Sequence, residues 1–260
     1  MNVSLEQVYH EIASNTDLNP NMLETCPKTK RYLNQKQFNA NEYTQLLSEF
    51  DLLNMNDVNN VIIGYSGTKE IIELFSNSFE NTLLLGIENA LIEDTIKFES
   101  EDPEQVILNG DPSTISIPNT AELYLLLDNA ISRVNHSQLE ELFGNAYSSL
   151  DKGGLLLVEF IPYDKLDGGT YYANKYTENG YTLHHHRISS VQQNPLHLAY
   201  VEQIKVTDPT GNSVSLTTHN TEHLHSNFSV KDTASKVGFK RTTLTDDPIN
   251  PNSMFLIAEK

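Results

Sequence analysis

The fold is decided by residues 61–72, which read VIIGYSGTKEII. A short apolar run enters a Gly-Tyr-Ser-Gly-Thr turn, and a segment with apolar residues at helical spacing follows. A buried strand that leads through a tight turn into a helix is where nucleotide-like cofactors usually bind. Because the turn has so few glycines, the pattern leaves three readings open: a cofactor loop, a degenerate cofactor loop, and a plain strand-turn-helix.

Short apolar runs recur from residue 58 to residue 160 and alternate with segments of helical period, such as KEIIELFSNSF and HSQLEELFGNAYSSL. Continuous Leu, Ile and Val indicate strands that are buried on both faces. We therefore predict an α/β fold with a mainly parallel sheet. The predicted strands are VIIGY (61–65), TLLLGIE (82–88), QVILNG (105–110), ELYLLLDNA (122–130) and LLLVEFI (155–161).

The two ends of the chain follow other patterns. Residues 1–55 contain SLEQVYHEIAS and NANEYTQLLSEFDLL, both of helical period, and predict an N-terminal helical cap. Residues 168–227 contain three long segments that alternate apolar with polar residues, YTLHHHRISSV, LHLAYVEQIKVTD and NSVSLTTHNTEHLH, which predicts an antiparallel insertion. Residues 228–260 predict a helix and two strands that complete the core, whose first part is residues 56–167.

The charge of the chain argues against a nucleic-acid substrate. Its 260 residues include 17 Lys and Arg against 35 Asp and Glu, for a formal net charge of −18. Proteins that bind nucleic acids gain most of their affinity from basic residues. No apolar run approaches the roughly 18–20 residues that cross a bilayer, so no membrane partner is expected. The single Cys26 forms no internal disulfide, which favours a cytoplasmic location.

Three features in order resemble the class I S-adenosylmethionine (SAM)-dependent methyltransferases. They are the strand-turn-helix of residues 61–72, the strand LLLGIENA that ends in an acid, and the paired glycines of SSLDKGGLLLVEF, with NGD at 109–111 between them. The insertion with His219, Glu222 and His223 is similar to that of the small-molecule N-methyltransferases that act on amino sugars. The resemblance implies a Rossmann-like sheet of about seven strands, with the insertion of residues 168–227 over the active site.

The same resemblance implies that SAM is the cofactor and that a small molecule is methylated at nitrogen or oxygen. The loop would lie under the methionine part of SAM, with backbone N–H groups facing its carboxylate. Glu88 would accept hydrogen bonds from the ribose hydroxyls, and Asp111 from the adenine amino group. A homodimer is also expected. The cofactor residues implied are Gly64, Tyr65, Ser66, Gly67, Glu88, Asp111 and Leu127.

The loop departs from the acid-x-Gly-x-Gly-x-Gly pattern of that family. Only Gly67 falls on the central glycine, while Tyr65 and Lys69 occupy the outer two positions and Ile63 replaces the acid. The alternative is therefore a protein that keeps the fold without methyl transfer, either as a binding partner or as a catalyst of another reaction.

The catalytic residues implied by the resemblance are Arg133, His136, His223 and Tyr32. Arg133 stands where the amino-sugar enzymes commonly carry a histidine. Arginine stays protonated and cannot act as a base, so it would bind an acidic group of the substrate. The alternatives are a salt-bridged Arg133, a His136 that only begins a helix, and a Tyr32 that only packs.

The histidines of the insertion raise a metal hypothesis. His184 and His186 would share one strand face, as would His223 and His225, because side chains alternate along a strand. Such imidazoles can bind Zn²⁺. No ligand signature such as HExxH accompanies them, so we expect no metal and assign them to a substrate-lining or solvent-facing role.

Overall fold

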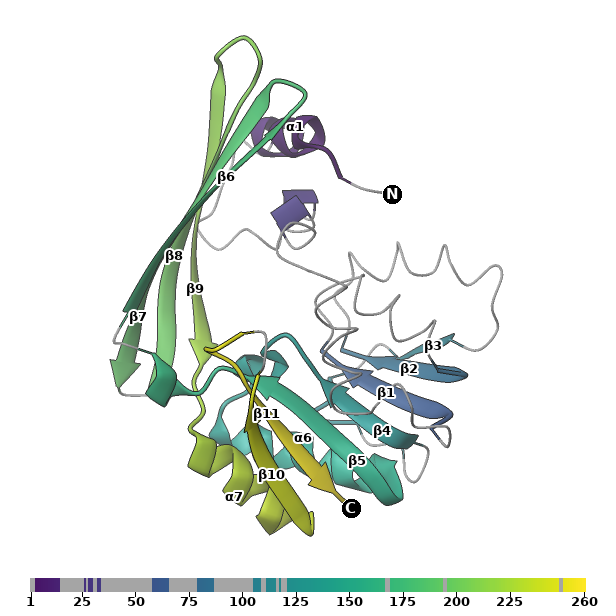
Figure 1. Ribbon diagram of the computed structural model, residues 1–260. Helices are drawn as coiled ribbons and strands as arrows, with labels where there is room; N and C mark the ends of the chain where they lie inside the picture. The colour runs from purple at the N-terminus through teal and green to yellow at the C-terminus, as the bar shows by residue number, and fades with distance from the viewer. Residues whose placement is uncertain are drawn as a thin grey trace. The chain divides into compact units, whose positions relative to one another are not determined.

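The computed structural model describes residues 3–14, 26, 28–29, 32–33, 58–65, 79–86, 105–108, 111–115, 117, 121–166, 169–193, 196–247 and 250–260. The chain forms two compact units (Figure 1). The antiparallel unit consists of Met1–Phe38 and Leu166–Glu222, and the core unit of Asn39–Lys165 and His223–Lys260. The division into a cap, a core, an insertion over the active site and a closing segment stays a prediction.

The core unit is built on one seven-stranded sheet of order β10-β11-β5-β4-β1-β2-β3. Strands β1 to β5 pair in parallel, and β11 runs antiparallel to both β5 and β10. The predicted sheet of about seven mainly parallel strands is thereby confirmed. Its strands are β1 (Asn60–Gly64), β2 (Asn81–Leu85), β3 (Gln105–Leu108), β4 (Ala121–Leu126), β5 (Leu150–Phe160), β10 (Arg241–Asp246) and β11 (Met254–Glu259).

The apolar runs form these strands because both faces of the central strands are buried. Val61, Ile62 and Ile63 of β1 are each 1% exposed. The paired glycines Gly153 and Gly154 lie within β5, where the pairing with β4 shifts register. They therefore mark an irregular entry into the strand rather than a separate turn.

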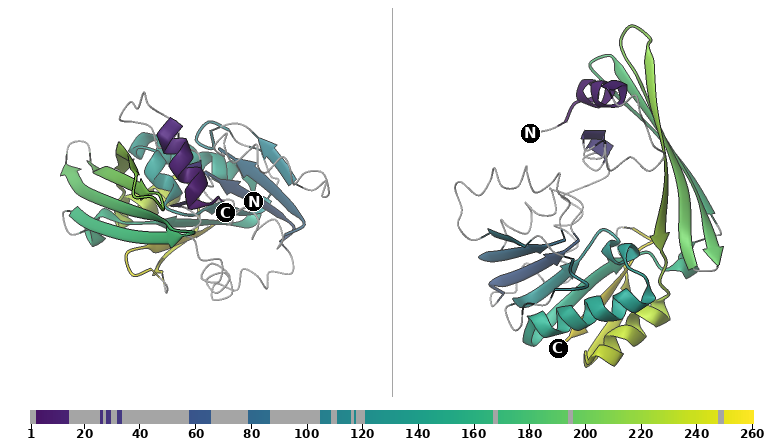
Figure 2. Two further views of the ribbon diagram at one scale, coloured as in Figure 1. Left: turned by 90° about the horizontal axis from the view of Figure 1, so that it is seen from above. Right: turned by 180° about the vertical axis from the view of Figure 1, so that it is seen from behind.

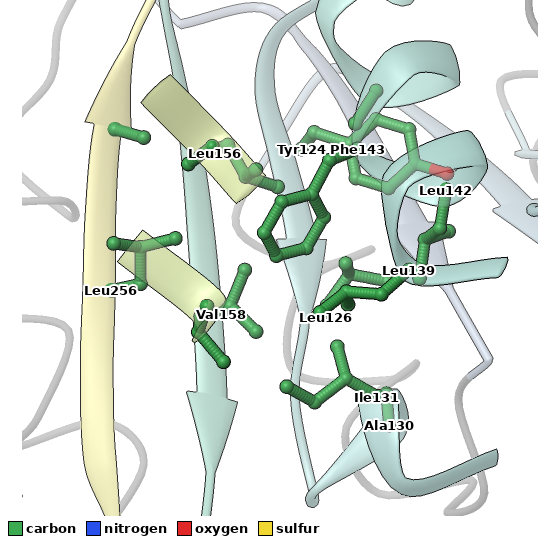
Figure 3. Packing of buried hydrophobic residues seen from close by; sticks show 14 of the residues in the cluster. Tyr124, Leu126, Ala130, Ile131, Leu139, Leu142, Phe143, Leu156, Val158 and Leu256 are labelled. Atoms are coloured by element: carbon green, nitrogen blue, oxygen red, sulfur yellow. The ribbon is translucent and has the colours of Figure 1, made fainter. Parts of the chain in front are cut away.

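Two helices pack beside each other on the core unit, α6 (His136–Ser149) and α7 (Asn227–Val237) (Figure 2). Asn135 begins α6 with a capping box that includes Gln138. Leu139, Leu142 and Phe143 point from α6 into a fully buried cluster with Tyr124 and Leu126 of β4 and with residues of β5 and β11 (Figure 3). This cluster anchors the segment between β4 and α6.

The antiparallel unit contains a four-stranded sheet of order β6-β7-β8-β9. Helix α1 (Leu5–Ser14) packs Leu5, Val8 and Ile12 against it. The predicted antiparallel strands and N-terminal helix are confirmed, except that the first strand was not predicted. The second predicted helix of the cap, NANEYTQLLSEFDLL, lies outside the described residues. The strands are β6 (Gly169–Glu178), β7 (Tyr181–Gln193), β8 (Leu196–Thr207) and β9 (Ser213–His223).

Within the ranges that the structure describes, no helix is both long enough and apolar enough to span a membrane.

Candidate functional site

The parallel strands reverse their order between β1 and β4. From β1 the sheet continues to β2 and β3 on one side, and to β4 and β5 on the other. Because Ile63 pairs with Leu125, Tyr65 and Leu127 lie level with each other at the carboxyl ends of the two strands. Ligands of open α/β sheets bind outside the carboxyl ends at such a switch point. The predicted cofactor residues Tyr65 and Leu127 therefore stand at the expected place.

Three residues at these strand ends have left-handed backbones. The φ angles are 55° for Tyr65, 55° for Asp128 and 52° for Asn129. Among the described residues, the remaining non-glycine residue with a positive φ is Asn179, in the turn between β6 and β7. Such conformations cost on the order of 1–3 kcal/mol each and cluster at functional sites. The left-handed residues thus lie after β1 and β4, the two strands between which the strand order reverses.

Gly64 lets β1 and β4 approach closely at this point. A Cβ on Gly64 would lie 2.8 Å from Leu126 Cδ2 and 3.4 Å from the Tyr124 hydroxyl oxygen. That hydroxyl is fully buried and makes no hydrogen bond in the part of the chain that the structure describes. Unpartnered buried hydroxyls are rare in proteins. The Tyr124 hydroxyl is therefore a buried polar group at the switch point that forms no hydrogen bond to the described residues.

The side chain of Tyr65 reaches Asp111, which follows β3. The Tyr65 hydroxyl donates a hydrogen bond to Asp111 Oδ1. The same oxygen accepts from the backbone N–H and the hydroxyl of Ser113, each at 2.8 Å. Asn145 of α6 donates to the carbonyl oxygens of Pro112 at 3.2 Å and Ser113 at 2.7 Å. Two predicted cofactor residues are thus in direct contact, in a turn that is anchored on α6.

The contact between Tyr65 and Asp111 shifts the pKa of both side chains. Burial raises the pKa of Tyr65, and the bond to Asp111 raises it further, to about 12. Burial alone raises the pKa of the Asp111 carboxyl, but the hydrogen bonds from Tyr65 and Ser113 outweigh it and hold that pKa below its ordinary value. At neutral pH the pair is therefore a neutral phenol that donates to a carboxylate.

Gly86 brings the end of β2 into the same cluster. It has a φ of 65°, and a Cβ there would lie 2.6 Å from Pro112 Cδ and 3.0 Å from Tyr65 Cδ1. Both the backbone angle and the space therefore require glycine. The carboxyl ends of β1, β2 and β3 meet around the Tyr65 ring.

The predicted catalytic residues Arg133 and His136 follow β4. Arg133 ends the 3₁₀ helix η2 (Ala130–Arg133), and its Cζ lies 6.0 Å from the centroid of the Tyr65 ring, the outer limit of a cation–π contact. His136 is the first residue of α6 and is exposed. The structure therefore brings Arg133 close to Tyr65, whereas His136 is near Arg133 only along the chain.

A buried histidine, His225, holds this segment and was assigned no catalytic role from the sequence. Its Nε2 lies 3.0 Å from the carbonyl oxygens of both Ile131 and Val134. Because carbonyl oxygens only accept, Nε2 carries the proton. Burial lowers the pKa of His225, and the neighbouring His136 and His223 lower it further. A neutral His225 thus fixes the entry to α6, with two predicted catalytic histidines close by.

Other predicted residues lie elsewhere. Tyr32 is 2% exposed in the apolar cluster of the antiparallel unit, where burial and the nearby Glu178 raise its pKa to about 12. Such burial is typical of a packing residue. The expectation that His223 and His225 share a strand face is wrong, because β9 ends at His223. Three predicted cofactor residues lie outside the described residues: Ser66, Gly67 and Glu88.

The antiparallel unit carries a second polar cluster, which the sequence analysis did not find. Arg187 Nη2 lies 3.2 Å from Glu222 Oε1, and Arg187 Cζ lies 3.6 Å from the centroid of the Tyr200 ring. His185 Nε2 lies 3.4 Å from Glu202 Oε1, and both side chains are buried. Burial and then Glu222 raise the pKa of Tyr200. In the described ranges, no group of three or more His, Cys, Asp or Glu residues is arranged to hold a metal ion.

No protein-family model and no curated protein matches the sequence. Solved structures do match. SAM-bound CalS10, an amino pentose methyltransferase from Micromonospora echinaspora, has a TM-score of 0.76 at 14% identity, over 95% of this chain and 100% of that chain. The sugar N-methyltransferase KedS8 from Streptoalloteichus has a TM-score of 0.73 at 12% identity, over 94% of both chains.

A SAM-dependent methyltransferase from Clostridium acetobutylicum is also similar, with a TM-score of 0.71 at 13% identity over 92% of this chain and 99% of that chain. Identities this low establish the fold. The chain thus has the Rossmann-like fold of class I methyltransferases with an antiparallel insertion, as the sequence predicted.

Proposed function

We propose that the protein is a SAM-dependent methyltransferase that acts on a nitrogen or oxygen atom of a small molecule. The observation that carries the proposal is the extent of the likeness to CalS10, which spans 95% of this chain and 100% of the other. A likeness limited to the parallel sheet would hold for many α/β proteins. Here it includes the antiparallel sheet, and CalS10 itself is a SAM-bound enzyme that methylates an amino pentose.

The described residues of the switch point fit SAM. Asp111 offers a carboxylate whose Oδ2 takes no hydrogen bond from the described residues, and this oxygen would accept from the adenine amino group. Gly64 lets β1 and β4 pack closely at the switch point, where the buried Tyr124 hydroxyl makes no hydrogen bond to the described residues. Bound SAM supplies a methyl group on a positively charged sulfur. The protein's task is to hold the acceptor in line with that methyl group.

We assign proton transfer to the histidines near α6. An amine acceptor must lose a proton to react, and a base within hydrogen-bond reach can take it. His136 and His223 can take up a proton, whereas Arg133 cannot. We assign the proton to His136 or His223, and to Arg133 the binding of an acidic group of the acceptor. His225, whose proton is engaged by two carbonyl oxygens, positions the segment instead.

The acceptor is a polar small molecule in this proposal, and the antiparallel unit carries a polar cluster that suits it. The cluster around Arg187, Tyr200 and Glu222 places both signs of charge and an aromatic ring side by side. Such a combination suits a ligand with hydroxyl and amino groups. A net charge of −18 argues against a nucleic-acid acceptor, and we place the protein in the cytoplasm as a homodimer.

The test is a titration of the purified protein with SAM and with its product S-adenosylhomocysteine, by calorimetry and by thermal shift. A ligand at 100 times its dissociation constant stabilises the folded state by about 2.7 kcal/mol. Asp111→Asn should weaken both ligands, whereas Asp232→Asn, the same change on the surface of α7, should leave them unaltered. If neither ligand moves the midpoint at millimolar concentration, the proposal fails.

A second candidate function is a protein with this fold that transfers no methyl group. The observation that favours it is the Tyr65 side chain, which stands at a glycine position and already donates to Asp111. This candidate predicts that SAM and S-adenosylhomocysteine do not bind. Binding followed by methylation of an amino sugar, detected by mass, would eliminate it.

A further inference from the structure

The face of the antiparallel sheet that packs against α1 becomes polar further along its strands; we call it the inner face. Leu183 of β7 and Ile204 of β8 belong to the apolar cluster that includes α1. The next positions on the same face of these strands are His185 and Glu202, whose Nε2 and Oε1 atoms lie 3.4 Å apart. Both side chains are buried, at 2% and 10% exposed. Ionisable groups are thus buried directly beside an apolar core, where they need partners.

His185 has a hydrogen-bond partner on one side of its ring. Its Nδ1 lies 3.1 Å from the hydroxyl oxygen of Tyr172 on β6. Its Nε2 is buried as well, approaches Glu202, and forms no hydrogen bond within the described part of the chain. Buried polar atoms without a partner are rare, and water, an ion or a ligand commonly completes their bonding. This nitrogen is the first indication that the cluster accommodates a further polar group.

A more accessible layer of the same cluster lies next to the buried pair. The side chains of Arg187 on β7 and Glu222 on β9 are 29% and 24% exposed, and Arg187 Nη2 lies 3.2 Å from Glu222 Oε1. The guanidinium carbon Cζ also lies 3.6 Å from the centroid of the Tyr200 ring. Arg187 is therefore engaged by a carboxylate and by an aromatic face at the same time. Its charge is balanced by Glu222, so Glu202 adds a second carboxylate to the cluster.

The hydroxyl of Tyr200 lies within the electrostatic field of both carboxylates. Burial raises the pKa of Tyr200, and Glu222 and then Glu202 raise it further, whereas Arg187 lowers it. The phenol therefore stays neutral at physiological pH, and its hydroxyl can both donate and accept a hydrogen bond. Two carboxylates and a neutral hydroxyl thus converge at one half-buried place on the inner face.

The charges on the inner face favour a cation over an anion. In the described parts of the four strands, Glu178, Glu202 and Glu222 alternate onto this face, and of the arginines and lysines there only Arg187 does. Glu178 is engaged at the start of α1, where it accepts a hydrogen bond from the N–H of Leu5 at 3.2 Å. An incoming anion would meet carboxylates around a guanidinium that is already paired, whereas a cation would be attracted.

We propose that this cluster binds the ammonium group of a small polar ligand that carries no phosphate. The ammonium group donates hydrogen bonds to the carboxylates of Glu202 and Glu222 beside the Tyr200 hydroxyl, and its positive charge balances the second carboxylate. The inference rests on the proposed function and narrows it: the acceptor is an amine that is not attached to a nucleotide diphosphate, whose negative charges would face these carboxylates. The ammonium group is held here whether or not the same nitrogen is the one methylated.

The experiment measures the binding of three sugars to the purified protein without SAM, by calorimetry and by ligand-observed NMR at pH 6.5. Glucosamine carries the ammonium group, glucose carries a hydroxyl in its place, and glucose 6-phosphate carries a phosphate. Glucosamine should bind at least about 10-fold more tightly than glucose, because charge-assisted hydrogen bonds are roughly twice as strong as neutral ones. Glucose 6-phosphate should bind more weakly than glucose.

Glu222→Gln keeps the shape of the side chain and removes its charge. It should weaken the binding of glucosamine by about 10-fold or more and leave that of glucose unaltered. Glu259→Gln is the matched control, because Glu259 also pairs with an arginine, Arg241, at 3.1 Å; it should alter the binding of neither sugar. Circular dichroism shows whether each variant is folded. If Glu222→Gln does not fold, the comparison of the three sugars on wild type still decides.

Glucose 6-phosphate that binds more tightly than glucosamine overturns the proposal, as does equal affinity for glucosamine and glucose, or no binding of any of the three. A folded Glu222→Gln variant that binds glucosamine as tightly as wild type also overturns it. The titration with SAM is a separate test. A protein that prefers glucosamine but does not bind SAM refutes methyl transfer and retains the ammonium site, whereas one that binds SAM and prefers the phosphate does the reverse.

Discussion

Replacing Tyr65 by Phe removes the hydroxyl that donates to Asp111 and keeps the ring. Hydrogen bonds to charged groups contribute about 1.5–3 kcal/mol to stability. The ring still packs against Gly86, so little packing is lost. We therefore expect Tyr65→Phe to lower the free energy of unfolding by about 1.5–3 kcal/mol at pH 8.

The pH dependence of that difference identifies the bond. In the folded state the pKa of Tyr65 is raised from 10.0 to about 12, so its contribution is complete below pH 10 and is lost as the pH rises toward 12. Two pKa units correspond to at most about 2.7 kcal/mol. The pKa of Asp111 is lowered, so its contribution is present above the unfolded value of about 3.9 and is lost as the pH falls through the folded value. The difference between wild type and Tyr65→Phe should thus shrink on both sides of neutrality.

The assay is urea unfolding followed by far-UV circular dichroism between pH 3 and pH 11. Tyr124 is coupled to Tyr65, and burial followed by Tyr65 and Asp111 raises its pKa. Tyrosines remote from Tyr65 cancel in the difference. Tyr163→Phe is the matched control, because Tyr163 is 39% exposed, and it should change stability by less than about 0.5 kcal/mol. Equal stability of wild type and Tyr65→Phe at pH 8, or a difference that stays constant up to pH 11, would refute the reasoning.

Three further predictions follow from the site. Glu88→Ala should weaken the binding of SAM, measured by calorimetry, by about 100-fold, because two charge-assisted hydrogen bonds to the ribose are lost. Asp111→Asn should weaken it by less, because only one contact to the adenine is lost. Equal affinities of wild type and Glu88→Ala for SAM would mean that the ribose binds elsewhere. Gly86→Ala should lower the free energy of unfolding by about 1–3 kcal/mol, since it combines a φ of 65° with a clash against Pro112; an unchanged melting temperature would contradict it. The lowered pKa of His225 means that wild type loses stability as the pH falls below about 6.5. His225→Gln should flatten this slope between pH 7 and pH 5, and an unaltered slope would show that another group is responsible.

The parallel strands could be predicted because burial on both faces leaves a continuous apolar run, as in Val61, Ile62 and Ile63. Strand β6 was missed for the opposite reason. Its side chains toward α1 are half-buried (Tyr172, Asn174, Tyr176 and Glu178), and those that alternate with them from Tyr171 to Thr177 are exposed. A strand whose two faces are both polar or aromatic carries no period-two signal, and only its pairing with β7 defines it.

The strand-end positions of Tyr65 and Asp111 could be predicted from the sequence, but the contact between them could not. Tyr65 and Asp111 were each placed at a strand end, yet they are 46 residues apart and their bond depends on the register of β1, β2 and β3. The cluster around Arg187 was missed because alternation assigns side chains to a face of the sheet and does not say which of them pair. Cross-strand register decides which charges pair, and a single sequence does not show it.

Tyr65 connects the departure from the family motif with the geometry of the loop. It occupies a glycine position of that motif, and its φ of 55° shows that the backbone still makes the left-handed turn that glycine adopts freely. For a residue with a Cβ, that conformation costs about 1–2 kcal/mol. The bond from its hydroxyl to Asp111 contributes about 1.5–3 kcal/mol, which is of similar size and opposite sign. A tyrosine that makes this hydrogen bond can therefore hold the left-handed backbone conformation of a glycine at position 65. The loss of this glycine from the sequence is thus not by itself evidence against a cofactor loop.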